Sequence, residues 1–362
     1  MKKQIKLFDP VIDKKEIASV VKTLKTKFWA SGGGGTNVNS FEEKFKKYTG
    51  SKSCVTVNSG TAALHLALSL FDIKNNEVIL PSLSFVSTAH AIVYNGGKPV
   101  FTDIDPKTLC IDPKAIENSI TKKTKAIIAV HFGGLPANIL EIKKICKKYN
   151  LFLIEDAAHA TGSTFQGKKI GTHADAVCFS FHPVKNLAMP TGGAITLNGK
   201  NKKYENILKI KRWCGISDRN GSQYNVKELG WNYYMNEISA AIGLEQLKKI
   251  DKMNSRRKKI AKQYFNEIQN SEKMPYDKNC SYHFYWIQVE NRERFMKEMQ
   301  NEKIETGIHY IPIHKMKYYS SKIDLPITEK IAKKIVSIPI HPNLTQTDIQ
   351  RIIKTINNLL KN

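Results

Sequence analysis

Long hydrophobic runs, paired cysteines and arginine clusters are all absent from this sequence. No apolar stretch approaches the ~20 residues that a membrane-spanning helix needs, and the start, Met1–Lys6, is not followed by the apolar stretch of a signal peptide. The 6 cysteines lie far apart and form no CxxC pair, which argues against a zinc site and against a disulfide framework. These absences predict a cytoplasmic protein with neither a bound metal nor a membrane partner.

Positive charge, in contrast, is abundant. The chain has 57 Lys and Arg against 32 Asp and Glu, a net charge of +25, but only seven of the basic residues are Arg. Surfaces that bind nucleic acid rely on Arg clusters and interleaved aromatic residues. We therefore interpret the scattered lysines as a solvated surface and expect no nucleic-acid partner. The excess charge would still favour anionic small molecules such as nucleoside diphosphates.

The 362 residues, 41% of them hydrophobic, suffice for two domains. Between residues 53 and 197 short apolar runs alternate with helical stretches, which predicts an α/β fold with a mostly parallel sheet covered on both faces. The expected strands are 54–57, 77–80, 99–102, 126–130, 151–155, 176–180 and 194–197. A long helix is expected over about 235–270, followed by a smaller mixed segment. We place the domain boundary inside that helix, with a large domain over 1–249 and a small one over 250–362.

Ahead of this region, helices are expected over 14–26 and 40–49. Four consecutive glycines, Gly32–Gly35, lie between them and predict a flexible loop, because glycine disfavours the interior of both helices and strands.

Residues capable of chemistry follow three of the expected strands, and ligands in open α/β sheets bind beyond the carboxyl ends of strands. Gly60 and Thr61 open a helix, whose free N–H groups suit a phosphate, although an ordinary helix cap is the alternative. Asp156 ends a buried strand; it could hold a proton on a ligand nitrogen, bind a metal, or be a structural carboxylate. Lys185 follows Ser180, and a desolvated lysine amine suits Schiff-base chemistry; the alternative is one more surface lysine.

Four separated motifs then occur in a recognisable order. They are SGTAALHLAL (59–68), EDAAHATGS (155–163), FSFHPVKN (179–186) and LGWNYYMNEISAAIGLEQL (229–247). Together they resemble the DegT/DnrJ/EryC1/StrS family of pyridoxal-phosphate (PLP) enzymes, which are mostly sugar aminotransferases, and the resemblance extends through nearly the whole chain. It implies a fold-type-I architecture, with a mostly parallel seven-stranded sheet between helices in the large domain and a smaller C-terminal α+β domain.

The resemblance implies a role for each matching residue. Lys185 would carry PLP and move the proton between cofactor and substrate, and Asp156 would keep the pyridine nitrogen protonated. His159 stands where the family usually has Gln and is expected near the ring or its 3′ oxygen. The other implied cofactor contacts are Phe85 on the ring face, Gly60, Thr61 and Ser180 at the phosphate, and Asn232, which would reach the phosphate from the neighbouring subunit. A shared site of this kind implies a homodimer.

The implied reaction moves an amino group from an amino-acid donor, with L-glutamate the first choice, to a keto sugar nucleotide. The residues His182–Asn186 around Lys185 resemble those of family members that act at C4 more than those that act at C3, which favours a 4-keto-6-deoxy sugar. The candidate substrate contacts are His309 and Tyr310, for which a packed loop is the alternative, and Lys211, Arg212 and Arg219 at the diphosphate.

Three alternatives stay open. One is an aminotransferase of the same fold that acts on a non-nucleotide keto sugar or keto-octulosonate. Another is a PLP-dependent sugar dehydratase, against which Lys185 argues because that branch of the family has His there. The third is a basic binding protein without enzymatic activity.

Overall fold

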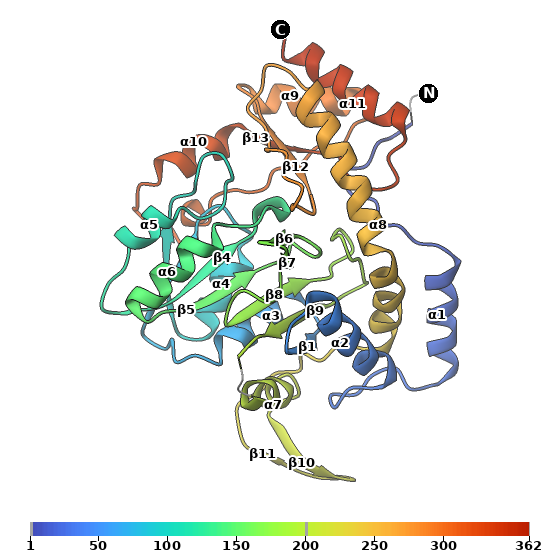
Figure 1. Cartoon of the computed structure of the whole chain (residues 1–362), viewed down its shortest axis with the longest axis vertical. Helices are drawn as coiled ribbons and strands as arrows, with labels where there is room; N and C mark the ends of the chain where they lie inside the picture. The colour runs from blue at the N-terminus through green and yellow to red at the C-terminus, as the bar shows by residue number, and fades with distance from the viewer. Residues whose placement is uncertain (1–2, 200–201, 362) are drawn as a thin grey trace.

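Figure 1 shows a computed structural model of the chain, which describes residues 3–199 and 202–361. Its centre is a seven-stranded sheet in the order β1-β9-β8-β5-β4-β2-β3. Five of these strands pair in parallel, whereas β9 pairs antiparallel with both β1 and β8. The strands are β1 (Ser53–Val57), β2 (Glu77–Pro81), β3 (Lys98–Thr102), β4 (Thr124–Val130), β5 (Phe152–Asp156), β8 (Ala176–Ser180) and β9 (Gly193–Leu197). The predicted mostly parallel α/β sheet is confirmed.

Helices cover both faces of the sheet, because successive strand residues point to opposite sides. Along β4, Ile127 and Ala129 belong to one apolar cluster, which includes residues of α2, α6 and α8. Ala126 and Ile128 belong to the other, which includes residues of α3, α4 and α7. The helices of this part are α1 (Lys14–Lys25), α2 (Thr36–Thr49), α3 (Gly60–Leu68), α4 (Ser87–Tyr94), α5 (Pro113–Asn118), α6 (Ile139–Tyr149), α7 (Lys202–Lys211) and α8 (Glu237–Glu267). Because both faces of the sheet are buried, the strands appear in the sequence as continuous apolar runs.

The 31-residue helix α8 leads from the large sheet to the C-terminal elements, beside which both chain ends lie in Figure 1. There β12 (Tyr285–Gln288) pairs antiparallel with β13 (Ile335–Ile338), next to α9 (Arg292–Asn301), α10 (Pro326–Lys334) and α11 (Gln346–Leu359). One apolar core runs from Phe41 in α2 to Ile352 in α11, so the division at residues 249 and 250 stays a prediction. None of the helices described is long and apolar enough to cross a membrane.

Several elements were not expected from the sequence. They are the helices α7 and α10, the short pair β6 (Thr164–Phe165) and β7 (Lys168–Lys169), the 3₁₀ turns η1 (Phe132–Gly134) and η2 (Ile313–Lys315), and the hairpin of β10 (Ile216–Asn220) and β11 (Gln223–Val226). The hairpin projects from the body of the molecule in Figure 1, and most of its residues are exposed. It therefore lacks the apolar alternation from which a strand can be predicted.

The glycine run forms a loop, as predicted, but contacts from distant parts of the chain hold it. A Cβ atom on Gly32 would lie 2.0 Å from the Trp213 ring, so only glycine fits against that indole. The Glu237 carboxylate accepts the N–H groups of Asn37 at 2.8 Å and Val38 at 3.0 Å, and so caps the start of α2. The first residue of α8 thereby fixes the end of the loop.

Candidate active site

The carboxyl ends of β1, β5 and β8 meet at one edge of the sheet. Since β1 and β8 both pair antiparallel with β9, they point the same way, and β5 lies parallel beside β8. The sheet order therefore brings together the turn at Gly60, the carboxylate of Asp156 and the loop that carries Lys185.

The first component is the turn between β1 and α3. Ser59 caps α3 and accepts the N–H of Ala62 at 3.1 Å. A Cβ atom on Gly60 would lie 2.7 Å from Cβ of Ser180, and one on Gly193 would lie 2.4 Å from the Ser59 carbonyl oxygen. Glycine is thus required for this close approach of β8 and β9 to the start of α3. Helix N–H groups next to a serine hydroxyl suit a phosphate group.

The second component is Asp156, which is buried at the end of β5. Its carboxylate accepts the Thr88 hydroxyl at 2.8 Å and the Ala158 N–H at 3.2 Å. Burial raises the pKa of Asp156, while these two hydrogen bonds and the charge of Lys185 act in the opposite direction. The carboxylate is therefore held rigidly and suits a protonated ring nitrogen.

Lys185 is the third component, and its surroundings separate it from the surface lysines. Its Nζ atom lies 3.4 Å from Nε2 of His283. Burial lowers the pKa of the Lys185 amine to about 8, although Asp156 opposes the shift. The loop is fixed from the other side, because Asn186 donates to the Asn254 side chain and to the Ser281 carbonyl, both at 2.9 Å. A lysine amine close to neutrality near pH 8 suits covalent attachment to an aldehyde.

Stacked rings form a wall beside the lysine. The rings of His159 and His283 stack with their centroids 4.8 Å apart, and Nε2 of His159 lies 3.0 Å from the Tyr310 hydroxyl. Burial lowers the pKa of both histidines well below the ordinary range, so both are neutral. Phe85 lies 6.0 Å from Tyr310, ring to ring, and is 55% exposed, which leaves its ring open for stacking. Nδ1 of His159 is buried and has no hydrogen-bond partner among the described residues.

The predicted substrate residues differ in their surroundings. Tyr310 contacts the site through His159, whereas His309 bonds through Nδ1 to the Ser337 hydroxyl at 2.8 Å and stacks on Phe284 at 4.5 Å. Burial lowers the pKa of His309 to about 4. These contacts match the packed-loop alternative for His309, and its part in substrate binding stays a prediction.

Asn232 lies at the surface, and its carbonyl oxygen accepts from the Asn58 side chain at 3.3 Å. A cavity of about 520 Å³ opens nearby, lined by Asn58, Ser59, Thr61, Ala62, His65, Tyr94, Trp231 and Tyr233. The contribution of Asn232 to a neighbouring subunit stays a prediction.

The expectation that Arg212 meets a diphosphate is wrong. Arg212 is 1% exposed, and its guanidinium forms an ion pair with Glu42 and donates to the Thr56 carbonyl at 2.9 Å. Lys211 donates to the Ser69 carbonyl at 2.9 Å, whereas Arg219 lies in the exposed β10–β11 hairpin. A guanidinium that faces an interior carboxylate is unavailable to a ligand.

Two side chains that reach the site residues were not singled out from the sequence, His283 and Thr88. His283 lies in SYHFYWI (281–287), a segment that belongs to the family resemblance, but nothing in the local pattern connects it with Lys185, 98 positions earlier. Thr88 lies in the first turn of α4 and reaches Asp156 only because β2 and β5 share a sheet.

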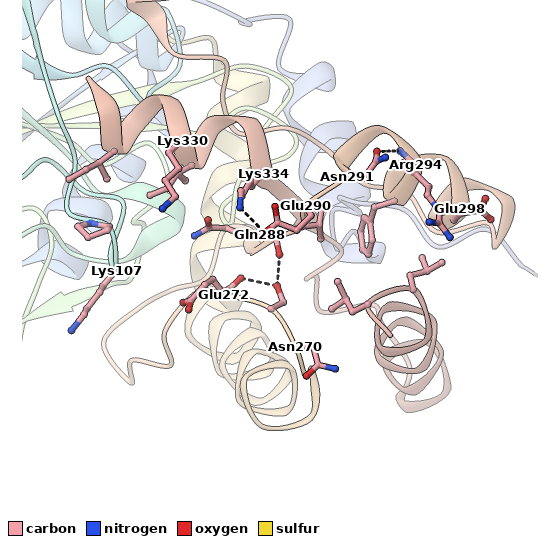
Figure 2. A pocket seen from close by; sticks show the side chains of 18 of the residues that line it. Lys107, Asn270, Glu272, Gln288, Glu290, Asn291, Arg294, Glu298, Lys330 and Lys334 are labelled. Atoms are coloured by element: carbon pink, nitrogen blue, oxygen red, sulfur yellow. Dashed lines mark hydrogen bonds and ion pairs between the residues drawn. The ribbon is translucent and has the colours of Figure 1, made fainter. Parts of the chain in front are cut away.

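A larger cavity, of about 1160 Å³, lies among α9, α10, α11 and β12, and none of its lining residues is a predicted site residue. Figure 2 shows charges of both signs around it, including the Lys334–Glu290 ion pair at 2.6 Å. Its size alone does not connect it with the chemistry at Lys185.

Three comparisons agree with this arrangement. The model of the DegT/DnrJ/EryC1/StrS aminotransferase family matches residues 10–357. The spore coat polysaccharide biosynthesis protein SpsC of Bacillus subtilis is 35% identical, over 97% of this chain and 96% of that protein. The structure of Helicobacter pylori PseC, an aminotransferase involved in pseudoaminic acid biosynthesis, superposes with a TM-score of 0.93 at 30% identity, over 99% of this chain and all (100%) of that one.

A further solved structure bears on the cofactor. The putative sugar aminotransferase Spr1654 of Streptococcus pneumoniae, in its PLP form, has a TM-score of 0.93 and 26% identity, over 99% of each chain. The same protein is also known in its PMP form. The residues of the present chain fit such a group, because a phosphate turn, a buried carboxylate, an open aromatic ring and a desolvated lysine amine surround one site. The chain belongs to the DegT/DnrJ/EryC1/StrS aminotransferase family and is a PLP-dependent aminotransferase.

Proposed function

We propose that this enzyme transfers an amino group from L-glutamate to a keto sugar carried on a nucleoside diphosphate, with a 4-keto-6-deoxy sugar as the first candidate. The observation that carries the proposal is the amine of Lys185, with its pKa near 8, beside His283 and close to Asp156. SpsC and PseC, named for polysaccharide and pseudoaminic acid biosynthesis, support a sugar as the acceptor. A cytoplasmic location and a nucleotide carrier remain parts of the proposal.

When bound, PLP supplies an electron-withdrawing ring that stabilises negative charge on the substrate carbon. Lys185 would hold the cofactor through its aldehyde, and its free amine would then carry a proton between the substrate carbon and the cofactor. An amine with a pKa near 8 can do both near neutral pH. His283 is neutral, and its Nε2 lies 3.4 Å from the Lys185 amine, where it would orient the free amine. Asp156 holds the proton on the ring nitrogen.

We also propose a homodimer, in which Asn232 reaches the phosphate site of the partner formed by Gly60, Thr61 and Ser180. The outer face of α1 supports this proposal. Its buried residues are Glu16 and Thr23, whereas Ile17, Val21 and Leu24 are exposed. The exposed apolar residues on and just after α1 are Ile17, Val21, Leu24, Phe28 and Trp29. A contiguous apolar stripe of this kind is typical of a protein–protein interface.

The test is the visible absorption of the purified protein with PLP, before and after L-glutamate, for the wild type and for Lys185→Ala. We expect a yellow wild type that bleaches with L-glutamate and retains the cofactor after borohydride treatment, and a variant that holds no cofactor covalently. A colourless wild type would contradict the site, and would favour the basic binding protein instead.

Colour without bleaching by L-glutamate would favour dehydratase chemistry or another donor. If bleaching occurs, the acceptor is identified by incubating the aminated enzyme with a panel of keto compounds and following the return of colour. Keto sugar nucleotides are expected to restore it, and a response only to free keto sugars or to a keto-octulosonate would contradict the nucleotide carrier.

A further inference from the structure

Phe8 brings the N-terminal part of the chain into contact with the active site. Its ring stacks on the imidazole of His283, with the ring centroids 5.3 Å apart and an angle of 20° between the planes. It also lies edge-on to His309 at 5.9 Å. The residue is half-buried and packs against the large apolar core. We call residues 5–11, which carry this ring, the N-terminal strap.

Hydrogen bonds tether the strap on both sides of Phe8. At one end the Ile5 N–H donates to the Lys303 carbonyl at 2.9 Å. At the other end the Val11 carbonyl accepts from the side chain of Gln246 on α8 at 2.7 Å. Because both ends are bound to the folded body, the backbone sets the position of the Phe8 ring.

The imidazole of His283, in contrast, has few polar contacts that could fix it. Its Nε2 lies 3.4 Å from Nζ of Lys185, and its Nδ1 has no hydrogen-bond partner among the described residues. A contact of 3.4 Å is long for a hydrogen bond, so a modest rotation of the ring would break it. The plane of this imidazole must therefore be held by packing.

Two rings stack on that plane. His159 lies at 4.8 Å with an angle of 24° between the planes, and Phe8 lies at 5.3 Å. Offset stacking favours one orientation of a ring over others. His159 belongs to the expected cofactor site, whereas Phe8 comes from a segment to which the sequence assigned no role in the chemistry.

We propose that Phe8 is a positioning residue, whose ring fixes the plane of His283 and so keeps Nε2 directed at the Lys185 amine. A neutral amine that donates one hydrogen to Nε2 has its lone pair oriented, as a nucleophile or a base requires. A leucine in place of Phe8 would keep an apolar side chain but lose the flat face. The role concerns the lysine itself, so it applies to any amino donor or keto acceptor.

The test measures the rate at which PLP attaches covalently to the cofactor-free protein, trapped with borohydride at successive times. The buffer is more alkaline than the Lys185 pKa of about 8, so that the amine is deprotonated. The variants are Phe8→Leu, Phe8→Tyr, His283→Leu and the double variant of Phe8→Leu with His283→Leu. The matched control is Asn343→Ala, which removes a 2.7 Å hydrogen bond to Asp9 of the strap but leaves the Phe8 ring in place.

We expect Phe8→Leu to slow the attachment about 5- to 10-fold, as for the loss of one hydrogen bond. Phe8→Tyr, which keeps the ring, and Asn343→Ala should stay close to the wild type. In the His283→Leu background, Phe8→Leu should cause no further loss, because it acts through His283. In the PLP-loaded enzyme, the rate of bleaching at saturating L-glutamate should fall by the same factor, while the half-saturating concentration stays unchanged.

An unchanged attachment rate in Phe8→Leu would overturn the inference. Equal slowing in Asn343→Ala would assign the effect to the tethers of the strap, and further slowing in the double variant would show a route other than His283; both contradict it. A raised half-saturating concentration at an unchanged maximal rate would make Phe8 a substrate contact instead. If His283→Leu does not fold, the Phe8 variants and the control decide.

Failure of the proposed function is distinguishable from these outcomes. A protein that binds no PLP would overturn the cofactor site and this inference together. A protein that attaches PLP but does not bleach with L-glutamate would contradict the proposed donor alone, and the attachment rates would still test the role of Phe8.

Discussion

Replacement of Arg212 by Met tests whether this residue stabilises the fold or binds a diphosphate, as expected from the sequence. Glu42 is 7% exposed, and its carboxylate accepts from Arg212 and, at 2.8 Å, from the N–H and the hydroxyl of Thr56. Arg212→Met leaves that carboxylate buried with the Thr56 donors but without its cation. We therefore expect a loss of stability and no loss of substrate affinity.

The size of the loss follows from the burial of the pair. Breaking a buried ion pair by removing one partner costs about 3–5 kcal/mol. At about 2.1 cal/mol/K of unfolding entropy per residue, the 362-residue chain has about 0.76 kcal/mol/K. The thermal midpoint of Arg212→Met should therefore fall by about 4–7 °C.

Calorimetry on the purified variants measures the midpoint, and steady-state kinetics measure KM for the keto sugar nucleotide. Arg219→Met is the matched control for the thermal midpoint, since Arg219 lies in the exposed hairpin and its charged group contacts, among the described residues, the Trp213 ring and the Gly221 carbonyl. The double variant Glu42→Gln with Arg212→Met should regain part of the lost stability, because neither charge is then left buried. An unchanged midpoint together with a raised KM in Arg212→Met would refute the reasoning.

Three further predictions concern the cofactor site. Gly60→Ala should weaken PLP binding, measured by equilibrium titration, because the added Cβ would lie 2.7 Å from Cβ of Ser180; wild-type affinity would contradict the close packing. Asp156→Asn should keep the Thr88 hydrogen bond and the yellow colour but lose about 100-fold or more in turnover, as for removal of one charge-stabilising group. In the cofactor-free protein, labelling of Lys185 by an amine reagent should rise with pH through a midpoint near 8, because below its pKa the amine is a protonated, unreactive ammonium. Peptide mapping at each pH measures the labelling. A midpoint near 10.5 would show that the site does not desolvate the Lys185 amine.

The local sequence determined the strands of the large sheet and most of the helices. Each strand is short, apolar and followed by glycine, proline or a polar cluster, and these are local signals. The four motifs located Gly60, Asp156 and Lys185 at strand ends, and their resemblance to a family supplied the cofactor. The β10–β11 hairpin escaped prediction because its mostly exposed, polar residues carry no comparable periodicity.

The tertiary structure alone decided which distant residues meet. The antiparallel insertion of β9 between β1 and β8, the approach of His283 to Lys185 across 98 positions, and the pairing of Arg212 with Glu42 depend on strand order and helix packing. In the same way, only the folded chain shows that the ring of Phe8 stacks on His283. The physical reason is that burial and the partners of a charge are properties of packed elements, whereas propensity and periodicity are properties of a local stretch of chain.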